Sequence, residues 1–305
     1  MAAADLPLAV GPVMISPVIG ADCALCVMSL NVKDIATVEK VLTLINEKIP
    51  LEESYVIEVM TAMAGMGATV DAPNWLNYET AADLQFGGIS CENARDIAYK
   101  VAEDNATDAV AQKLAGRRKK LLIADMESTI IENEMLDELA SDIGIHDRIA
   151  SITASAMNGE VDFETAIEER VKLLAGLDNS ALQNAAERIQ ITKGAEQLIS
   201  TMQSKGAFCA LVSGGFSFYT STIRRRLGFD FDQANQLEIV EGKLTGNVIK
   251  PILGRKAKEK CLRELCTQKN IPLSATIAVG DGANDLAMLT AADMGIAFHA
   301  KPVVA

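Results

Sequence analysis

Two carboxylates stand two residues apart at the end of an apolar, strand-like segment. Asp125 and Glu127 follow the segment 121–124 directly. Because side chains two residues apart along a strand point the same way, both carboxylates would leave the strand end in one direction. Such a pair suits a nucleophile beside a general acid/base, or a site for a hard metal ion. The pair often arises by chance, so its meaning depends on the rest of the chain.

Two further apolar segments end in polar and glycine-rich residues. The first runs into Ser213-Gly214-Gly215, which offers a hydroxyl and backbone N–H groups of the kind that receive a phosphate at a helix start. The second runs into Gly280–Asp285, where glycines permit a tight turn that brings Asp281 and Asp285 to one edge. This turn is not a dinucleotide-binding motif, because Asp285 stands where the third glycine belongs. A structural turn would explain any one of these endings, but three together indicate a site.

Together these residues form one consistent set for chemistry at phosphorus. An Asp carboxylate is ionised at neutral pH, so Asp125 could attack phosphorus without a base and become an aspartyl-phosphate. Mg²⁺ held by carboxylates would remove the repulsion between the two anions. A Lys, together with the Ser hydroxyl, would neutralise the oxygens of the transferred group, and Lys256 and Lys258 are the candidates.

The elements that must position these residues follow an α/β pattern. Continuous apolar runs that alternate with helical stretches predict a parallel sheet covered on both faces, with its ligand at the carboxyl ends of the strands. About 80 residues between the first two strands are nearly all helical in pattern, which is more than a crossover needs and predicts a helical cap. Residues 237–249 alternate around a Gly and predict a β-hairpin. We expect strands at 121–124, 208–212, 275–279 and 294–298, and cap helices at 134–142, 146–157, 162–175 and 179–189.

Residues 1–115 are expected to form a separate small α+β domain, ACT-like in type. The pattern predicts strands near 23–31 and at 54–60, an amphipathic helix at 35–45 and a second helix near 91–103. Such a domain would bind an amino acid as a regulatory module or mediate dimerisation, and the sequence leaves both open. The polar stretch 103–120 is expected to lead into the second domain, residues 116–305.

Length and composition limit the classes of protein that need consideration. The 305 residues suffice for about two domains, and the hydrophobic share of 49% is typical of globular chains. The net charge of -13 argues against nucleic acid or an anionic membrane as a partner, because the average field repels both. No apolar run reaches about 18 residues and the start of the chain lacks a signal-peptide pattern, so we expect a cytoplasmic protein. Cys23 and Cys26 match a C-x-x-C spacing, but their apolar surroundings favour buried thiols over a redox or metal site.

In its motifs the chain resembles the phosphoserine phosphatases of the haloacid dehalogenase superfamily, over about residues 118–305. The resemblance implies a Rossmann-like core with a cap inserted at about 132–195. It implies Mg²⁺-dependent hydrolysis of O-phospho-L-serine to serine and phosphate, the last step of serine biosynthesis.

The resemblance also implies roles for individual core residues. Asp125 would be the nucleophile and a metal ligand, and Glu127 would act as general acid/base while its backbone carbonyl binds the metal. Lys258 is preferred to Lys256 as the motif lysine, because the family has Leu four positions later, here Leu262. The remaining implied residues are Asp281 and Asp285 for the metal, Ser213 and Gly214 for the phosphate, and Asn284 for the phosphate or substrate.

The cap carries the substrate signature of the family. Glu134 matches the residue that meets the substrate amino group, and Met157, Phe163 and Arg170 match those that shield the site and hold the substrate carboxylate. A zwitterionic amino acid needs one anion and one cation, and Arg can bind a carboxylate through two bonds. Each residue alone would be a solvated charge or a core side chain, but their joint spacing favours a binding site.

Glu127 departs from the family pattern, which has Asp at this position. Its side chain is longer by one methylene, about 1.5 Å. We expect metal binding to persist through the backbone carbonyl, and the acid to work less efficiently unless the backbone adjusts to it. The chain also ends at Ala305, soon after Lys301 and Pro302, where relatives continue, and we expect a truncated chain to be less stable.

Two alternatives to hydrolysis remain at this point. The same covalent intermediate allows phosphotransfer to another hydroxyl acceptor. In a different class, the chain would be a phosphoserine-binding protein whose turnover is impaired by Glu127. In each case the expected partner is a small molecule, with no nucleic acid and no membrane, and a homodimer is left open.

Overall fold

The computed structural model describes residues 37–46, 49–102, 107–157 and 161–300. The strand expected near 23–31, Cys23, Cys26 and the end of the chain at Ala305 lie outside these residues. Contacts divide the chain into two compact units with a boundary in the sequence between Val110 and Ala111, and Glu39–Val41 are grouped with the second unit. Within the described ranges, no helix is both long and apolar enough to cross a lipid bilayer.

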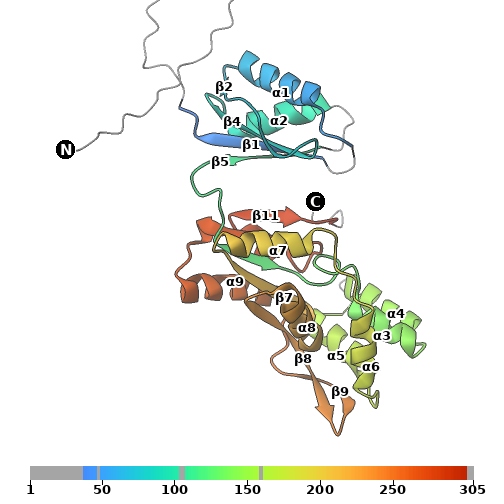
Figure 1. Cartoon of the computed structure of the whole chain (residues 1–305). Helices are drawn as coiled ribbons and strands as arrows, with labels where there is room; N and C mark the ends of the chain where they lie inside the picture. Colours follow the sequence, from blue (N-terminus) through green and yellow to red (C-terminus); the bar gives the residue numbers. More distant parts are fainter. Residues whose placement is uncertain (1–36, 47–48, 103–106, 158–160, 301–305) are drawn as a thin grey trace, which may run out of the picture. The chain divides into compact units, whose positions relative to one another are not determined.

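The first unit is a five-stranded sheet with two helices (Figure 1). Its strands follow the order β2-β4-β1-β5, and β3 also pairs with β4. The two helices pack against each other. The elements are β1 (Lys40–Ile45), α1 (Glu53–Gly65), β2 (Thr69–Val70), β3 (Asn74–Asn77), β4 (Ala81–Gly87), α2 (Cys91–Ala102) and β5 (Asp108–Lys113).

Two elements predicted for this unit are wrong, and a third is confirmed. Strand β1 occupies most of the expected helix 35–45, and helix α1 contains the expected strand 54–60. The consecutive apolar residues of β1 reflect a central strand buried on both faces, a pattern that short runs share with helices. In α1 the buried residues are Val56, Val59 and Met63, which recur at helical spacing. The helix expected near 91–103 is confirmed as α2.

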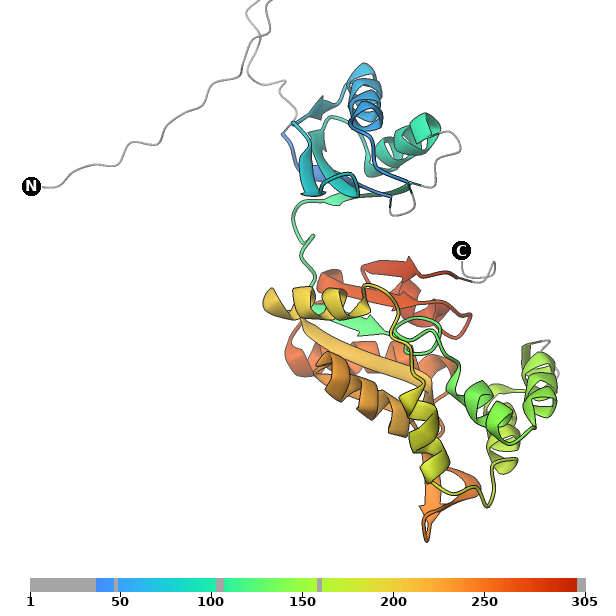
Figure 2. The ribbon, with the colours of Figure 1, turned by 45° about the vertical axis from the view of Figure 1, so that its right-hand side comes forward.

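The second unit contains a six-stranded sheet in the order β11-β10-β6-β7-β8-β9 (Figure 2). Strands β11, β10, β6, β7 and β8 pair in parallel, and β9 closes an antiparallel hairpin with β8. The four predicted strands, the parallel sheet and the hairpin are therefore confirmed. The elements are β6 (Leu121–Ala124), α7 (Ala195–Ser204), β7 (Phe208–Phe216), α8 (Ser217–Leu227), β8 (Phe231–Val240), β9 (Lys243–Ile249), α9 (Arg255–Lys269), the 3₁₀ helix η2 (Leu273–Ala275), β10 (Thr276–Gly280), α10 (Leu286–Ala291) and β11 (Met294–Ala297).

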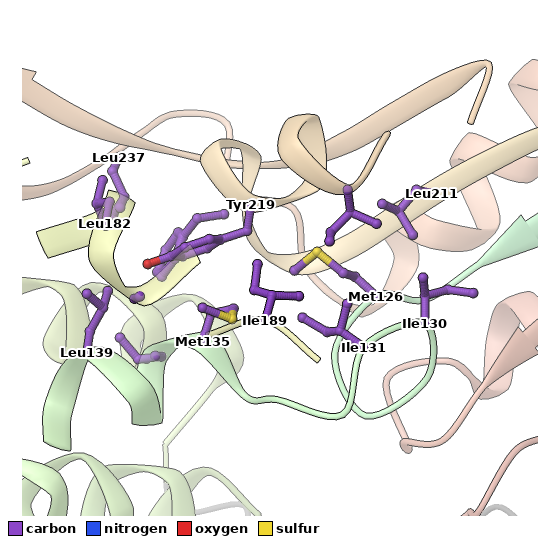
Figure 3. Packing of buried hydrophobic residues seen from close by; sticks show 14 of the residues in the cluster. Met126, Ile130, Ile131, Met135, Leu139, Leu182, Ile189, Leu211, Tyr219 and Leu237 are labelled. Carbon is purple, nitrogen blue, oxygen red and sulfur yellow. The ribbon is translucent and has the colours of Figure 1, made fainter. Parts of the chain in front are cut away.

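Strand β6 shows how the sheet is buried on both faces. Its alternate residues Leu122 and Ala124 belong to one hydrophobic cluster, while Leu121 and Ile123 belong to another. The first cluster includes residues of the cap and of α8 (Figure 3). The second includes residues of α9 and α10. Because a strand directs successive side chains to opposite faces, an uninterrupted apolar run is what a doubly covered strand requires.

A helical cap is inserted between β6 and α7, as the sequence predicts. Its helices are α3 (Met135–Asp142), α4 (His146–Met157), α5 (Phe163–Lys172) and α6 (Ser180–Glu187). A β-bridge between Ile131 and Ile191 closes the two connections to the core. The loop after α5 also contacts the hairpin, because Gly176 donates its N–H to Leu244 O at 2.8 Å and Leu244 donates to Leu177 O at 2.8 Å. The cap is thus fastened to the rest of the second unit at two places.

Candidate active site

Asp125 lies buried at the carboxyl end of β6, where the strand gives way to a turn. Its Oδ1 accepts the N–H of Met126 at 2.7 Å, and its Oδ2 lies 2.7 Å from Nζ of Lys258. One oxygen is therefore fixed by the backbone and the other by a cation. This arrangement orients the carboxylate without a neighbouring base.

Lys258 joins two strand ends through a single ammonium group. It projects from the first turns of α9 and is buried, with Nζ 2.6 Å from Oδ1 of Asp285 as well as 2.7 Å from Asp125. Burial lowers the pKa of Lys258, but the charges of Asp125 and Asp285 outweigh it and hold the pKa above its ordinary value. The ammonium group is therefore protonated at neutral pH.

Asp281 and Asp285 bring two more carboxylates from the end of β10. With Asp125 they form a buried group in which one oxygen from each lies within 4.8 Å of the others. Gly280 makes this possible, because a Cβ at that position would stand 2.5 Å from Cγ of Asp285. The Asp285 Oδ2 also accepts the N–H of Gly282 at 3.0 Å.

The charge balance of this group fits a divalent cation. Lys258 pairs with Asp125 and Asp285, and Asp281 adds a third carboxylate, so the four side chains carry an excess of two negative charges when all three carboxylates are ionised. Burial raises the pKa of Asp125 to about 7, with Lys258 opposing the rise and Asp285 adding to it. Carboxylate oxygens are the ligands that hard divalent cations prefer, and such a cation would remove the excess charge.

A small pocket opens beside Lys258 at the end of β7. Ser213 is buried there, and its Oγ accepts the N–H of Gly215 at 2.8 Å. The helix start expected at this point comes slightly later, because β7 continues through Phe216 and α8 begins at Ser217. The pocket is lined by Phe163, Val212, Ser213, Gly214, Leu253, Gly254, Ala257, Lys258 and Asn284.

Phe163 covers this pocket from the cap. Its ring carbon Cζ stands 3.4 Å from the place that a Cβ would take on Gly214, so the ring lies at van der Waals distance from this strand end. Asn284 is held in a similar way against Gly282. A larger groove shares Phe163 and Gly254 with the pocket, and Lys256 lines that groove rather than the pocket.

Glu127 points from the core toward the start of the cap. Its Oε1 accepts the N–H of Met135, the first residue of α3, at 3.0 Å. Burial, together with the nearby charge of Glu134, raises the pKa of Glu127 to about 8. A carboxyl group with such a pKa is largely protonated at neutral pH, as a general acid requires.

The other cap residues are brought near the same acid. Glu134 precedes α3 and its Oε1 accepts the hydroxyl of Ser128 at 2.7 Å. Burial lowers the pKa of Arg170, and three acidic side chains oppose that shift: Glu127, Asp137 and Glu134. Met157 is the last residue of α4, and its side chain lies outside the described part of the chain.

A comparison with protein families decides the affiliation of this chain. Residues 122–290 match the family model of the haloacid dehalogenase-like hydrolases. The chain belongs to this family. In structure it is similar to a haloacid dehalogenase family hydrolase from Salmonella enterica serovar Typhi, with a TM-score of 0.75 and 27% identity over 87% of this chain and 91% of that one.

The relatives of the present chain include two phosphoserine phosphatases, and the match covers a different share of each. The one from Streptomyces coelicolor is 43% identical over 227 residues, 74% of this chain and 55% of the relative. This chain thus spans about half the length of that curated relative. The one from Methanocaldococcus jannaschii is 40% identical over 188 residues, 62% of this chain and 89% of the relative.

One buried polar residue of this haloacid dehalogenase-like hydrolase escaped prediction from the sequence. Asn235 lies within β8 and donates an N–H to the backbone oxygen of Gly214 at 2.8 Å. Asn is disfavoured inside strands, so its place in the run Gln233–Leu237 was a signal that could have found it. Strand propensity alone does not say which groups such a side chain bonds.

Proposed function

We propose that the protein hydrolyses O-phospho-L-serine to serine and phosphate through an aspartyl-phosphate at Asp125. The observation that carries the proposal is the buried group in which Lys258 bridges Asp125 and Asp285 beside a pocket with Ser213 and Gly214. The substrate follows from relatives that are named phosphoserine phosphatases, among them those from Streptomyces coelicolor and Methanocaldococcus jannaschii. On that assignment, the reaction is the last step of serine biosynthesis.

In the first step the Asp125 carboxylate attacks phosphorus and the bond from phosphorus to the seryl oxygen breaks. Lys258 and the bonded Met126 N–H hold the two Asp125 oxygens, so the nucleophile is oriented before the substrate arrives. Glu127 gives its proton to the seryl oxygen as that bond breaks. Its raised pKa supplies the acid at neutral pH.

In the second step water attacks the phosphorus of the aspartyl-phosphate. Glu127, now a carboxylate, accepts a proton from that water while the bond from phosphorus to Asp125 breaks. Phosphate leaves, and Asp125 and Glu127 return to their starting states. Phe163 above the pocket keeps bulk water from the first step.

The three clustered carboxylates and the backbone carbonyl of Glu127 would hold a divalent cation, which we assign as Mg²⁺. When bound, the ion supplies positive charge that offsets the repulsion between the phosphate and the carboxylates. Lys258, Ser213 and the N–H groups near Gly214 would bind the phosphate oxygens, with Asn284 beside them.

The cap would select the amino-acid portion of the substrate. Glu134 would meet its ammonium group and Arg170 its carboxylate, since the two carry opposite charges and act on one another electrostatically. Phe163, and Met157 with it, would shield the bound substrate. This assignment makes the zwitterion the feature that is recognised.

A substrate panel tests this function. Phosphate release with Mg²⁺ is compared for O-phospho-L-serine, phosphoethanolamine, which lacks the carboxylate, and 3-phosphoglycerate, which has a hydroxyl in place of the amino group. We expect kcat/KM for phosphoserine to exceed both by at least about tenfold, the value of one well-made polar contact. Equal values would contradict the substrate assignment, and no release from any of them would contradict the hydrolase.

The family match to hydrolases does not favour the phosphotransferase or the binding protein. Product analysis with added homoserine distinguishes transfer from hydrolysis, because transfer would yield phosphohomoserine. Location in the cytoplasm and assembly as a homodimer stay predictions of the sequence.

A further inference from the structure

Asn235 is a buried amide that connects two loops of the phosphate pocket. The residue as a whole is only 1% exposed. The Nδ2 group donates to the backbone oxygen of Gly214 at 2.8 Å, and Oδ1 accepts the N–H of Leu253 at 2.7 Å. Gly214 and Leu253 both line the pocket. The amide itself does not line it, so any effect on a ligand must pass through these loops.

The pairing of β7 with β8 explains why the Gly214 carbonyl needs this partner. The two strands pair in regular register up to Val212 and Gln233, and the next pair is Phe216 with Asn235. Strand β7 therefore advances four residues where β8 advances two, and the segment Ser213–Gly215 bulges out of the ladder. The carbonyl of Gly214, which is partly buried in this bulge, loses its ladder donor, and the Asn235 amide supplies one.

The second bond holds the approach to α9. Leu253 directly precedes Gly254, the N-cap of the helix that carries Lys258. One planar amide thus fixes the distance between the Ser213–Gly215 bulge and the start of α9. The hydroxyl and N–H groups on one side and the ammonium on the other would converge on the same phosphate.

We propose that Asn235 is a positioning residue for the phosphate, which it serves by holding the Ser213–Gly215 bulge and the start of α9 in register. The inference rests on the proposed function in taking the pocket to be the phosphate site. Asn235 would act on phosphate binding and not on metal binding in this active site. The metal-binding carboxylates come from the ends of β6 and β10, which Asn235 does not contact through its bonds, so it should govern phosphate affinity and leave metal affinity alone.

The test measures binding of two probes by calorimetry to the full chain: Mg²⁺ alone, and inorganic phosphate in the presence of Mg²⁺. Asn235→Ala removes both hydrogen bonds, and Asn235→Leu removes them while nearly conserving volume. Asn46→Ala is the matched control, because Asn46 is also buried and bridges Thr107 Oγ1 and the N–H of Ile49 in the first unit. Circular dichroism and thermal unfolding establish that each variant is folded.

For both Asn235 variants we expect phosphate affinity to fall by roughly 10- to 100-fold, the range that loss of a buried hydrogen bond gives. Mg²⁺ affinity should stay within about twofold of the unsubstituted protein, and Asn46→Ala should change neither affinity. The kcat for phosphoserine should fall by on the order of 10²-fold, as it does when reacting groups are misplaced by about 1 Å.

Unchanged phosphate affinity in a folded Asn235 variant overturns the proposal. An equal loss of Mg²⁺ and phosphate affinity also overturns it, because that result describes a general loosening of the sheet. If Asn235→Leu folds and Asn235→Ala does not, the phosphate and Mg²⁺ affinities of Asn235→Leu test the proposal by the same criteria. A protein that binds phosphate but leaves phosphoserine unhydrolysed contradicts the proposed function alone, and the phosphate affinities still decide the role of Asn235.

Discussion

The carboxylate of Glu127 lies directly against the backbone of Gly215: a Cβ on Gly215 would stand 2.6 Å from Oε2 of Glu127. This contact matters because the resemblance implies a shorter Asp at the position of Glu127. The missing side chain at 215 supplies the room that the extra methylene takes. The longer acid is thus accommodated by the neighbouring strand end, and the N–H of Met135 fixes it there.

We predict that Gly215→Ala lowers kcat by on the order of 10²-fold, because the new methyl group displaces the acid from its position. In a Glu127→Asp background, the factor by which Gly215→Ala lowers kcat should be about tenfold smaller, since the shorter side chain leaves space for the methyl group. Gly65→Ala is the control, because a Cβ there meets nothing within 4 Å. Steady-state kinetics of the four proteins of the double-mutant cycle give the coupling. Additive effects of the two substitutions would show that the contact has no role in placing the acid.

Lys258 is expected to support the fold as well as the reaction. Lys258→Met leaves its buried carboxylate partners without their shared cation, so the metal-free protein should lose about 3 to 5 kcal/mol of unfolding free energy. The control is Lys260→Met, because the Lys260 side chain is 75% exposed and its contact with Glu264 is 3.7 Å long. The unfolding free energy of each variant is measured by urea unfolding, once without metal and once with saturating Mg²⁺. A loss for Lys258→Met no larger than that of the control would show that the buried pair contributes little.

The stability of the metal-free protein should fall as the pH rises above neutrality. Burial raises the pKa of Asp125 to about 7 and that of Glu127 to about 8, so the folded state holds these protons more tightly than the unfolded state. The stabilisation is complete below the unfolded pKa near 4 and is lost as the pH rises through 7 to 8. We expect a higher melting temperature at pH 6 than at pH 8.5, and a smaller difference in Glu127→Gln. Saturating Mg²⁺ should also reduce the difference in melting temperature, because the ion favours the ionised carboxylates. A melting temperature of the metal-free protein that is independent of pH would contradict the raised pKa values.

Arg170 should control the choice of substrate rather than the reaction itself. Arg170→Gln should raise the KM for phosphoserine by roughly tenfold or more, which is the loss of a charge-assisted bond to the carboxylate. The KM for phosphoethanolamine should change little, because that ester has no carboxylate to bind. Lys172→Gln serves as control, since Lys172 is an exposed cation on the same helix. Equal increases for both substrates would place Arg170 outside the recognition of the carboxylate.

The sequence predicts the core of this fold better than the first unit, and the reason is physical. Residues 121–124 form a run too short and too apolar for a helix and are followed by acids, which together favour a buried strand. The run around Val41 and Leu44 is similarly apolar, but no distinctive polar residues follow it. Its pattern predicts a helix, whereas the structure has strand β1 there. Local periodicity cannot tell a doubly buried strand from one face of a short helix.

The same contrast holds for the site. Asp125 and Asp285 were predicted to lie at strand ends, and the parallel sheet brings them to one lysine. Asn235 was missed because its role depends on a bulge in the neighbouring strand, which the local sequence does not reveal. The contact between Glu127 and Gly215 also depends on two strands that lie adjacent only in the folded protein.

Trapping the covalent intermediate tests the central claim most directly. Phosphoserine labelled in its phosphate is mixed with the protein and Mg²⁺, the reaction is quenched in acid within one turnover, and the peptides are mapped. We predict label on the peptide that contains Asp125, its release by hydroxylamine as expected of an acyl phosphate, and neither label nor turnover in a folded Asp125→Asn variant. Label on another residue, or phosphate release by Asp125→Asn at the rate of the unsubstituted protein, would contradict the account.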